Sequence, residues 1–247
     1  MLDIFKKYIK IGKIKLFLDL TKPHEKNYYS SIKNNDFYLA QKLINKGYKV
    51  LDLGANIGFT SLLYLSFGAR EVYAFEPVKE LFDRLKKLKT TDIKAYNLAI
   101  SNFEGETNIF LSTTHNQGHS LNNLWPQQFK EVFINDKSQK VRVTTLDNLL
   151  INDNFDFIKI DVEGAEKDVI EGGDIFFRRN KNAIIQIEIY NQQFFETDKL
   201  LKKYYNFTYI PIFEFEDVVF KNINDFEDNE LIEFKGPPNY IYSNREL

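Results

Sequence analysis

A glycine-rich loop near residue 54 is the part of the sequence best suited to hold a ligand. The apolar segment 49–53 leads into the loop 54–58, which reads Gly-Ala-Asn-Ile-Gly, and a helix-favouring segment 59–67 follows. Gly54 and Gly58 lack a Cβ, so the backbone can come close to a bound molecule at those two points. The helix that starts after the loop offers unpaired N–H groups to a negative group. The pattern therefore predicts a strand, a ligand-binding turn and a helix.

A carboxylate stands where a nucleotide-binding unit places one. The apolar segment 71–75 leads to Glu76, 18 residues after Gly58, and an acid there can accept hydrogen bonds from two ribose hydroxyls. The loop lacks the middle glycine of the dinucleotide pattern G-x-G-x-x-G, and no Walker lysine is present. A ligand without phosphates, such as S-adenosylmethionine, suits this loop better, while a plain tight turn is the alternative. Asp52, at the end of the first strand, would orient the loop amides or face the ligand's ammonium group.

Further carboxylates follow two later apolar segments. The segment 155–160 has the most continuous buried-strand pattern, and Asp161 and Glu163 come directly after it. Either Asp161 caps a helix, with Glu163 near the positive end of the helix dipole, or both point from the carboxyl end of a strand into a ligand crevice. Glu188 lies near the end of the predicted strand 183–189. A carboxylate in an apolar run is costly unless it is paired or functional.

A polar excursion over residues 112–139 separates two predicted strands. A stretch this long in a compact domain is usually functional or mobile, so we expect a lid-like insertion. It contains His115 and His119, which are interpreted as a metal-binding pair, as a source of one proton acceptor, or as solvated loop side chains. It also contains Trp125, which would stack on a sugar or simply pack.

The remaining patterns predict the elements that position these residues. Helices are expected at 36–45, 81–88 and 194–204 and between Asp161 and Gly172, and strands at 93–100, 107–111, 140–145, 207–215 and 239–243. Asn97 or Ser101, near the end of the third strand, would meet an adenine edge or close a turn.

The first 35 residues are predicted to form a helical extension to a main domain of residues 36–247. Apolar side chains in segment 2–20 fall near one helical face with lysines between them, as in an amphipathic helix. Such a helix either rests on an anionic membrane surface or packs on the domain with its lysines in water.

Composition narrows the class of protein. The 247 residues are 43% hydrophobic, enough for one domain with a sizeable core. Lys and Arg number 33 against 35 Asp and Glu, and this balance argues against nucleic-acid binding by bulk electrostatics. The lack of cysteine excludes disulfides, thiolate metal sites and cysteine nucleophiles. Since lysines interrupt the N-terminal apolar residues and no run is long enough to span a membrane, we expect a cytoplasmic protein.

Taken in order, these motifs resemble the FkbM family of S-adenosylmethionine-dependent methyltransferases. The resemblance runs from about residue 50 to 190 and rests on the motifs Asp52–Gly58, Phe75-Glu76-Pro77, Asn97-x-Ala99, Thr145-Leu146-Asp147, Lys159–Glu166 and Ile187-Glu188. It implies an α/β, Rossmann-like class I methyltransferase fold, with a seven-stranded, mostly parallel sheet and helices on both faces.

The resemblance also implies a reaction and a set of binding residues. The reaction would be methyl transfer to oxygen, with S-adenosylmethionine as cofactor. The residues expected to bind the cofactor are Asp52, Gly54, Ala55, Asn56, Gly58, Glu76, Asn97 and Asp161. Asp161 would stand between the cofactor and the acceptor.

A neutral hydroxyl is a poor nucleophile, so a general base should matter. The candidates, in order, are Asp161, Glu188 and His119, and Mg²⁺ held by Asp161 and Glu188 is considered but not predicted. The acceptor is expected to be a sugar or a capsular, lipopolysaccharide or glycolipid precursor. Alternatives are a polyketide, a lipid, a phosphorylated metabolite, a protein, or no acceptor at all in an inactive binding module.

Two rival enzyme classes are less well supported. Amino-methylating DNA enzymes have an Asn/Asp-Pro-Pro-Tyr/Phe block after the fourth strand, where this sequence has Asp161-Val162-Glu163. A nicotinamide dehydrogenase would need the glycine spacing that the loop lacks.

Overall fold

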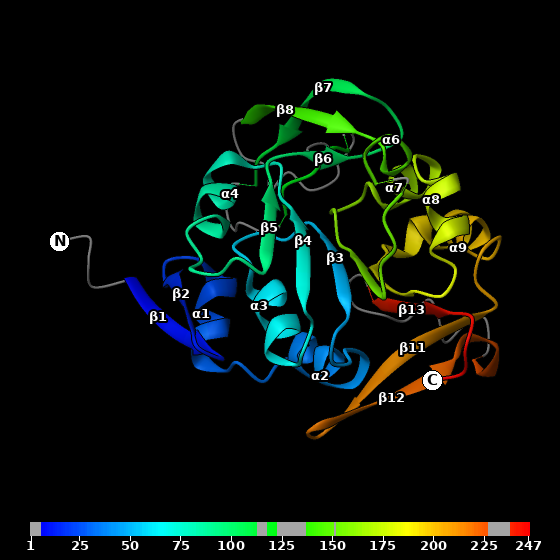
Figure 1. The fold of residues 1–247 in the computed structure, drawn as a ribbon, viewed down its shortest axis with the longest axis horizontal. Helices are drawn as coiled ribbons and strands as arrows, with labels where there is room; N and C mark the ends of the chain where they lie inside the picture. Colours follow the sequence, from blue (N-terminus) through cyan, green and yellow to red (C-terminus); the bar gives the residue numbers. More distant parts are fainter. Residues whose placement is uncertain (1–5, 113–117, 123–136, 151, 227–237) are drawn as a thin grey trace.

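The computed structural model describes residues 6–112, 118–122, 137–150, 152–226 and 238–247. Most of the predicted insertion at 112–139 lies outside these residues, and so do His115 and Trp125. The description below therefore concerns the sheet, its covering helices and the N-terminal segment (Figure 1).

The core of the chain is an eight-stranded sheet in the order β12-β11-β13-β10-β9-β3-β4-β5. Its strands are β3 (Lys49–Leu53), β4 (Glu71–Phe75), β5 (Ile93–Tyr96), β9 (Phe157–Ile160), β10 (Ile184–Glu188), β11 (Phe207–Glu214), β12 (Asp217–Asn222) and β13 (Asn239–Ser243). The five strands from β10 to β5 are parallel, while β13 is antiparallel to both of its neighbours and β12 is antiparallel to β11. The predicted strands at 49–53, 71–75 and 155–160 thus lie side by side, and their carboxyl ends meet at one edge.

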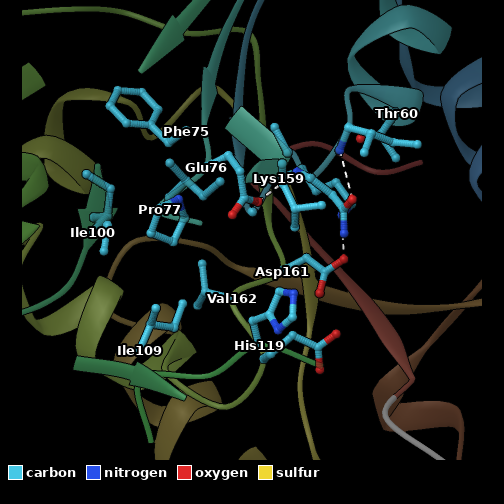
Figure 2. A pocket seen from close by; sticks show the side chains of 18 of the residues that line it. Thr60, Phe75, Glu76, Pro77, Ile100, Ile109, His119, Lys159, Asp161 and Val162 are labelled. Atoms are coloured by element: carbon cyan, nitrogen blue, oxygen red, sulfur yellow. Dashed lines mark hydrogen bonds and ion pairs between the residues drawn. The ribbon is translucent and has the colours of Figure 1, made fainter. Parts of the chain in front are cut away.

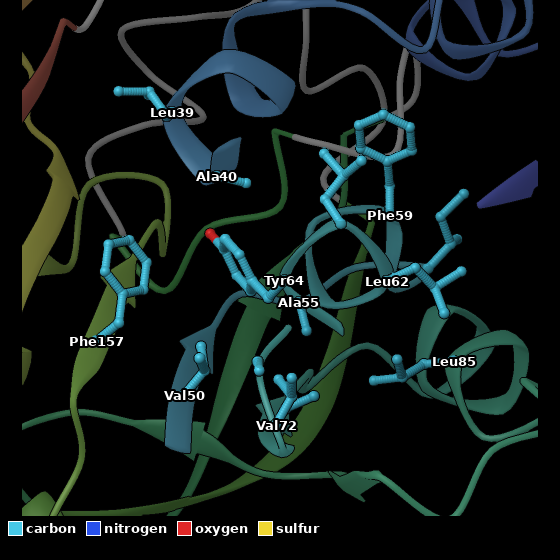
Figure 3. Packing of buried hydrophobic residues seen from close by; sticks show 14 of the residues in the cluster. Leu39, Ala40, Val50, Ala55, Phe59, Leu62, Tyr64, Val72, Leu85 and Phe157 are labelled. Atoms are coloured by element: carbon cyan, nitrogen blue, oxygen red, sulfur yellow. The ribbon is translucent and has the colours of Figure 1, made fainter. Parts of the chain in front are cut away.

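Helices cover both faces of the sheet because the central strands are apolar on both sides. Val50 and Leu51 of β3 belong to two different hydrophobic clusters, one on each face. The first face is covered by α2 (Asn35–Leu43), α3 (Phe59–Ser66) and α4 (Lys79–Leu85), and its packing is shown in Figure 3. The second is covered by α6 (Leu146–Leu150), α7 (Glu166–Glu171), α8 (Asp174–Arg179) and α9 (Phe194–Leu201). This arrangement is the predicted Rossmann-like α/β fold.

The strand count differs from the prediction of seven. The additional strand, β12, pairs only with β11, at the end of the sheet. Its sequence, DVVFKN, mixes apolar and charged residues as an edge strand does, so it has no buried-strand pattern to reveal it.

The predicted strand 93–100 is divided between two sheets. Its first half is β5, and its second half, β6 (Ala99–Ile100), joins β8 (Ser138–Thr144) and β7 (Gly105–Phe110) in a separate sheet. The chain leaves the main sheet at Asn97, whose side-chain amide donates hydrogen bonds to the carbonyl oxygens of Glu76 and Pro77 at 3.0 and 2.8 Å.

The helix predicted over residues 2–20 is wrong, because residues 6–19 of this segment form a hairpin. Its strands are β1 (Lys6–Ile11) and β2 (Ile14–Asp19), joined at Gly12, which has a φ of 57°. Inward-facing residues recur at every second position and join the first hydrophobic cluster: Ile9, Ile11, Leu16 and Leu18. The period-two pattern, with a glycine able to adopt positive φ, was therefore the decisive signal. The helix α1 (Pro23–Ser30) follows the hairpin.

Among the described residues, no helix has both the length and the apolar character needed to cross a membrane.

Candidate active site

A pocket opens at the carboxyl ends of β3, β4 and β9 (Figure 2). The strand order changes direction here, because β4 and β5 are added on one side of β3 and β9 and β10 on the other. It encloses about 870 Å³ of space that is open to solvent on one side. Ligand sites in open α/β sheets form at this switch point. The sequence-predicted residues that line it are Gly54, Ala55, Asn56, Glu76, His119 and Asp161.

Glu76 is a buried carboxylate that faces the pocket from the end of β4. Its Oε2 accepts a hydrogen bond from the backbone N–H of Asn56 at 2.9 Å, and its Oε1 accepts one from the N–H of Val78 at 2.8 Å. Burial raises the pKa of Glu76 to about 7, although these hydrogen bonds oppose the shift. A carboxylate has about four acceptor positions, so Glu76 both fixes the loop and retains acceptor capacity for a ligand.

The loop 54–58 needs glycine for reasons that the structure makes explicit. Gly54 has a φ of 83°, and a Cβ there would lie 1.8 Å from the carbonyl oxygen of Asp161. Gly58 has a φ of 88°, and a Cβ there would meet the side chains of Leu85 and Leu88. Gly54 is therefore required for the two ligand-facing loops to touch, and Gly58 for α4 to pack against the start of α3.

Asp52 does not line the pocket. It is fully buried, and its Oδ2 accepts hydrogen bonds from the hydroxyls of Thr60 and Ser61 at 3.0 and 2.6 Å. Its Oδ1 has no hydrogen-bond partner in the described part of the chain. Burial raises the pKa of Asp52, and the hydrogen bonds from the two hydroxyls oppose this shift. In this geometry Asp52 anchors the first turn of α3 and does not contact the loop amides.

Asn97 and Gly58 also lie outside the pocket lining. Asn97 has its side-chain amide engaged on the carbonyls of Glu76 and Pro77, so it holds the end of β4 in place. Ser101 is buried, and its backbone N–H donates to the carbonyl of Thr144. Asn97 or Ser101 was expected either to meet an adenine edge or to close a turn, and these contacts match the second interpretation.

Asp161 lines the pocket and forms an ion pair with a buried lysine from its own strand. Lys159 Nζ lies 2.6 Å from Asp161 Oδ2, and the lysine side chain is only 6% exposed. Burial lowers the pKa of Lys159, but the nearby carboxylates of Asp161 and Asp52 outweigh it and raise that pKa well above its ordinary value. Lys159 is therefore a permanent cation, and its ion pair fixes the position of the Asp161 side chain inside the pocket.

The loop after Asp161 is held by Glu166. The helix α7 begins at Glu166 with Ala165 as its N-cap, so the interpretation of Asp161 as a helix cap is wrong. Glu166 is buried and accepts hydrogen bonds from the backbone N–H groups of Val162 and Gly164 at 3.0 to 3.1 Å. Burial raises the pKa of Glu166 to about 7. This clamp lets Glu163 line the pocket in a left-handed conformation with a φ of 55°.

The remaining candidate bases differ in position and protonation. His119 lines the pocket, and its Nδ1 accepts a hydrogen bond from the N–H of Ser112 at 2.9 Å. The neutral ring then carries its proton on Nε2. Glu188 does not line the pocket, and burial together with the charges of Asp161 and Glu163 raises its pKa well above the ordinary value. No group of three His, Asp or Glu side chains able to hold a metal occurs among the residues described.

Sequence reasoning missed several residues of the pocket wall. Lys159 stands in the motif quoted above, where its spacing from Asp161 was a usable signal. Tyr28 of α1 and Asp36 of α2 also line the pocket, and Tyr28 stacks on Phe59 with ring centroids 3.7 Å apart. No local pattern marks these two, because tertiary packing alone brings them to the site.

Comparison with known proteins identifies the family. The sequence model described as the methyltransferase FkbM domain matches residues 52–219, about two thirds of the chain. This chain belongs to the FkbM methyltransferase family. Membership confirms the resemblance drawn from the motifs, the predicted class of S-adenosylmethionine-dependent methyltransferases and the cofactor of that class. No curated protein matches the chain.

One solved structure agrees at the level of the fold, and two others are similar to a lesser degree. The FkbM methyltransferase of Methylobacillus flagellatus KT is 15% identical with a TM-score of 0.53, and the alignment covers 90% of this chain and 51% of that one. The chain thus spans about half the length of that protein. TYW2 of M. jannaschii, in complex with AdoMet, is 12% identical with a TM-score of 0.45, covering 96% of this chain and 84% of that one. A TehB-like methyltransferase of Corynebacterium glutamicum is 11% identical with a TM-score of 0.45, covering 90% and 95%.

The lining residues of this FkbM family member are compatible in chemistry with S-adenosylmethionine. Glu76 has acceptor capacity left for ribose hydroxyls, and the apolar side chains of Phe75, Pro77, Leu98 and Ile100 form a wall near it that suits a base. Asp161 supplies a carboxyl group that favours a positively charged ligand. Burial and the charge of Asp161 raise the pKa of Glu163 well above its ordinary value, so Glu163 is a hydrogen-bonding group of the lining.

Proposed function

We propose that this FkbM family member transfers a methyl group from S-adenosylmethionine to a hydroxyl oxygen of a sugar, glycan precursor or other small polyol. The observation that carries the proposal is the ion pair of Asp161 with buried Lys159 in the same pocket as Glu76. The cofactor, when bound, supplies the methyl group on a positively charged sulfonium. The chain's own task is to hold the hydroxyl oxygen in line at roughly 3 Å and to take up its proton.

Asp161 is the best placed of the candidate bases. Its Oδ2 is tied to Lys159, while its Oδ1 accepts no hydrogen bond from the described residues. Glu188, with its raised pKa, holds a proton to a higher pH than an ordinary glutamate and lies outside the pocket lining. His119 already uses Nδ1 as an acceptor, so its neutral ring has no second nitrogen to take up a proton. We assign proton removal to Asp161 and orientation of the acceptor to His119.

The charge of the pocket supports a neutral acceptor. Asp36, Glu76, Asp161 and Glu163 line it, against Lys159 as the single lysine or arginine of the described lining. Burial raises the pKa of Asp36 and, with the charge of Asp161, raises that of Glu163 well above its ordinary value, so these groups act as hydrogen-bonding partners more than as charges. Because Lys159 is already paired with Asp161, no cation in the described lining is left for a phosphate, whereas a hydroxyl would find acceptors for its proton. The absence of cysteine fits a reducing cytoplasm, where we place the reaction.

The test is a methyl-transfer assay with labelled S-adenosylmethionine and a panel of sugars, nucleotide sugars, glycolipids and hydroxylated small molecules. Asp161→Asn should lower kcat by roughly 10²- to 10⁴-fold, while Glu188→Gln, which mimics a protonated carboxyl, should retain most of it. Unchanged turnover in Asp161→Asn would contradict the assignment of the base. Cofactor binding without product from any acceptor would indicate a binding module instead of an enzyme.

A further inference from the structure

The hairpin formed by β1 and β2 has two chemically different faces. Its inner residues are buried against the domain, with Ile11 and Leu18 only 5% and 1% exposed. On its outer face Tyr8 and Phe17 lie opposite each other, with ring centroids 5.9 Å apart. Phe17 is 65% exposed and Tyr8 46%. Two large aromatic side chains are therefore exposed to water on the outer face, although the inner face of the same hairpin buries its apolar side chains.

Lysines surround this aromatic pair. Lys10 and Lys15 are opposite each other on the same outer face, and the Lys15 ammonium lies 4.4 Å from the centroid of the Tyr8 ring. Lys7 and Lys13 are also exposed. The sequence has no acidic residue between Asp3 and Asp19, although the whole chain carries a formal charge of −2. Positive charge is thus concentrated on the hairpin and is not a general property of the molecule.

The acidic groups packed beside the hairpin do not neutralise it. Asp19 accepts hydrogen bonds from the backbone and hydroxyl of Thr21 at 3.0 and 2.7 Å. Glu25 is completely buried, and Arg84 pairs with both of its carboxylate oxygens at 2.8 and 2.6 Å. Arg84 thus balances the charge of Glu25, and Asp19 leaves one negative charge against the five lysines of residues 6–15, so the outer face keeps its positive charge.

We propose that the outer face of the hairpin, formed by Tyr8, Lys10, Lys15 and Phe17, docks on a membrane that contains anionic phospholipid. Aromatic rings at the centre would enter the interfacial layer, and the lysines around them would contact lipid phosphates. Each lysine near such a surface strengthens binding roughly fivefold. This inference goes beyond the proposed function and does not depend on it.

The shape of the face favours a membrane over a nucleic acid. The face is a two-stranded ribbon at the outer edge of the molecule (Figure 1), whereas single-stranded nucleic acid is bound in a groove with rings free to stack on bases. Here the two rings are tilted by 58° to each other, and Lys15 covers one ring. The outer face therefore suits a flat, anionic, partly apolar surface.

Docking would also orient the pocket, because the hairpin is fixed to the pocket wall. Arg84 donates a hydrogen bond to the carbonyl oxygen of Phe17 and pairs with Glu25 of α1. The same helix contributes Tyr28 to the lining of the pocket. The outer face and the pocket thus belong to one rigid arrangement.

The experiment is co-sedimentation of the whole chain with phosphatidylcholine vesicles, with or without phosphatidylglycerol. We expect binding only to the anionic vesicles, and we expect added salt to weaken it. Lys10→Gln with Lys15→Gln should weaken binding roughly 25-fold, and Tyr8→Ser with Phe17→Ser should abolish it. The matched controls are Phe215→Ser, at the fully exposed tip of the β11–β12 hairpin, and Lys181→Gln with Lys203→Gln.

Thermal melting and a titration with S-adenosylhomocysteine will show that each variant is folded. Equal loss of binding in the control variants, or no binding of the wild type to anionic vesicles, would overturn the proposal. It would also be overturned if the wild type bound heparin or an oligonucleotide but not anionic vesicles, since the face would then recognise a soluble polyanion.

Discussion

The two loops that face the pocket are built in the same way but used differently. Each follows a parallel strand, and each is held by a buried carboxylate that accepts hydrogen bonds from backbone N–H groups: Glu76 for the loop 54–58 and Glu166 for the loop 161–166. Burial raises the pKa of both carboxyls to about 7. Only Glu76 lines the pocket, however. Glu76 is therefore available to a ligand, while Glu166 only stabilises the loop that it holds.

The difference shows that two properties decide whether a buried carboxylate can bind a ligand: the number of acceptor positions it has left, and whether it faces the pocket. Glu166 accepts three hydrogen bonds from the turn that precedes it, which leaves little of its acceptor capacity. Glu76 accepts one hydrogen bond per oxygen from two separate segments. The loop 161–166, called the acidic loop below, instead presents Asp161 to the pocket, where the ion pair with Lys159 fixes that side chain.

The largest effect should come from the point where the two loops touch. Gly54→Ala would place a Cβ 1.8 Å from the Asp161 carbonyl oxygen, so we expect unfolding free energy to fall by more than about 4 kcal/mol. Gly47→Ala is the matched control, because Gly47 also has a positive φ, 89°, but has nothing within 4 Å of the added Cβ. It should lose only about 1–2 kcal/mol. Urea unfolding measures both, and equal losses would show that backbone strain, and not the clash, decides.

The ion pair of the acidic loop gives the next prediction. Lys159→Met removes the cation that stabilises negative charge beside Asp161, so the acid limb of the methyl-transfer pH profile should move to higher pH. Lys159→Arg, which keeps the charge, should restore much of the wild-type profile. A pH profile of kcat measures this, and an unshifted profile in Lys159→Met would separate Asp161 from proton removal.

Glu166→Gln should affect stability and not ligand binding. The substituted amide retains one acceptor oxygen but directs an N–H group at backbone donors, which costs about 1–3 kcal/mol. Thermal unfolding and cofactor titration measure the two quantities separately. A large loss of cofactor affinity with unchanged stability would contradict the assignment of Glu166 as a loop clamp.

The last prediction is a pH dependence of stability shared by both loops. Because the folded-state pKa values, about 7, exceed the ordinary value of 4.5, the two carboxyls stabilise the fold most below pH 4.5. That contribution is lost as the pH rises to about 7. Glu76→Gln and Glu166→Gln should each flatten the stability profile between these limits. If neither variant altered the slope, these carboxyls would not be the groups that titrate there.

Much of the sheet was predictable because its central strands are short apolar runs between glycine or proline signals. The hairpin was not predicted, since Ile9 and Leu16 were assigned to one helical face with Leu2, Phe5 and Leu20. Ile11 and Leu18, which complete the strand period, lie opposite that face and were left out of it. The pocket residues on strand ends, Glu76 and Asp161, were predictable from position. Tyr28 and Asp36 were not, because their place depends on how two N-terminal helices pack over the loop.

The motifs also could not assign roles within the site. Asp52 and Asn97 occur at the expected positions but their side chains support α3 and the end of β4. Glu166 and Glu76 are alike in the sequence, each an acid beside a loop. Only the hydrogen-bond partners of each carboxylate separate a binding group from a clamp.

The most direct test is a calorimetric titration of S-adenosylmethionine, S-adenosylhomocysteine and NAD⁺ into the wild type, Glu76→Gln and Glu166→Gln. We predict that both adenosyl ligands bind and NAD⁺ does not. Glu76→Gln should weaken both adenosyl ligands roughly 10- to 100-fold, since the charge-assisted bonds to ribose are lost, while Glu166→Gln binds normally. Undiminished binding in Glu76→Gln, or binding of NAD⁺ in place of the adenosyl ligands, would contradict the ligand assignment of the pocket.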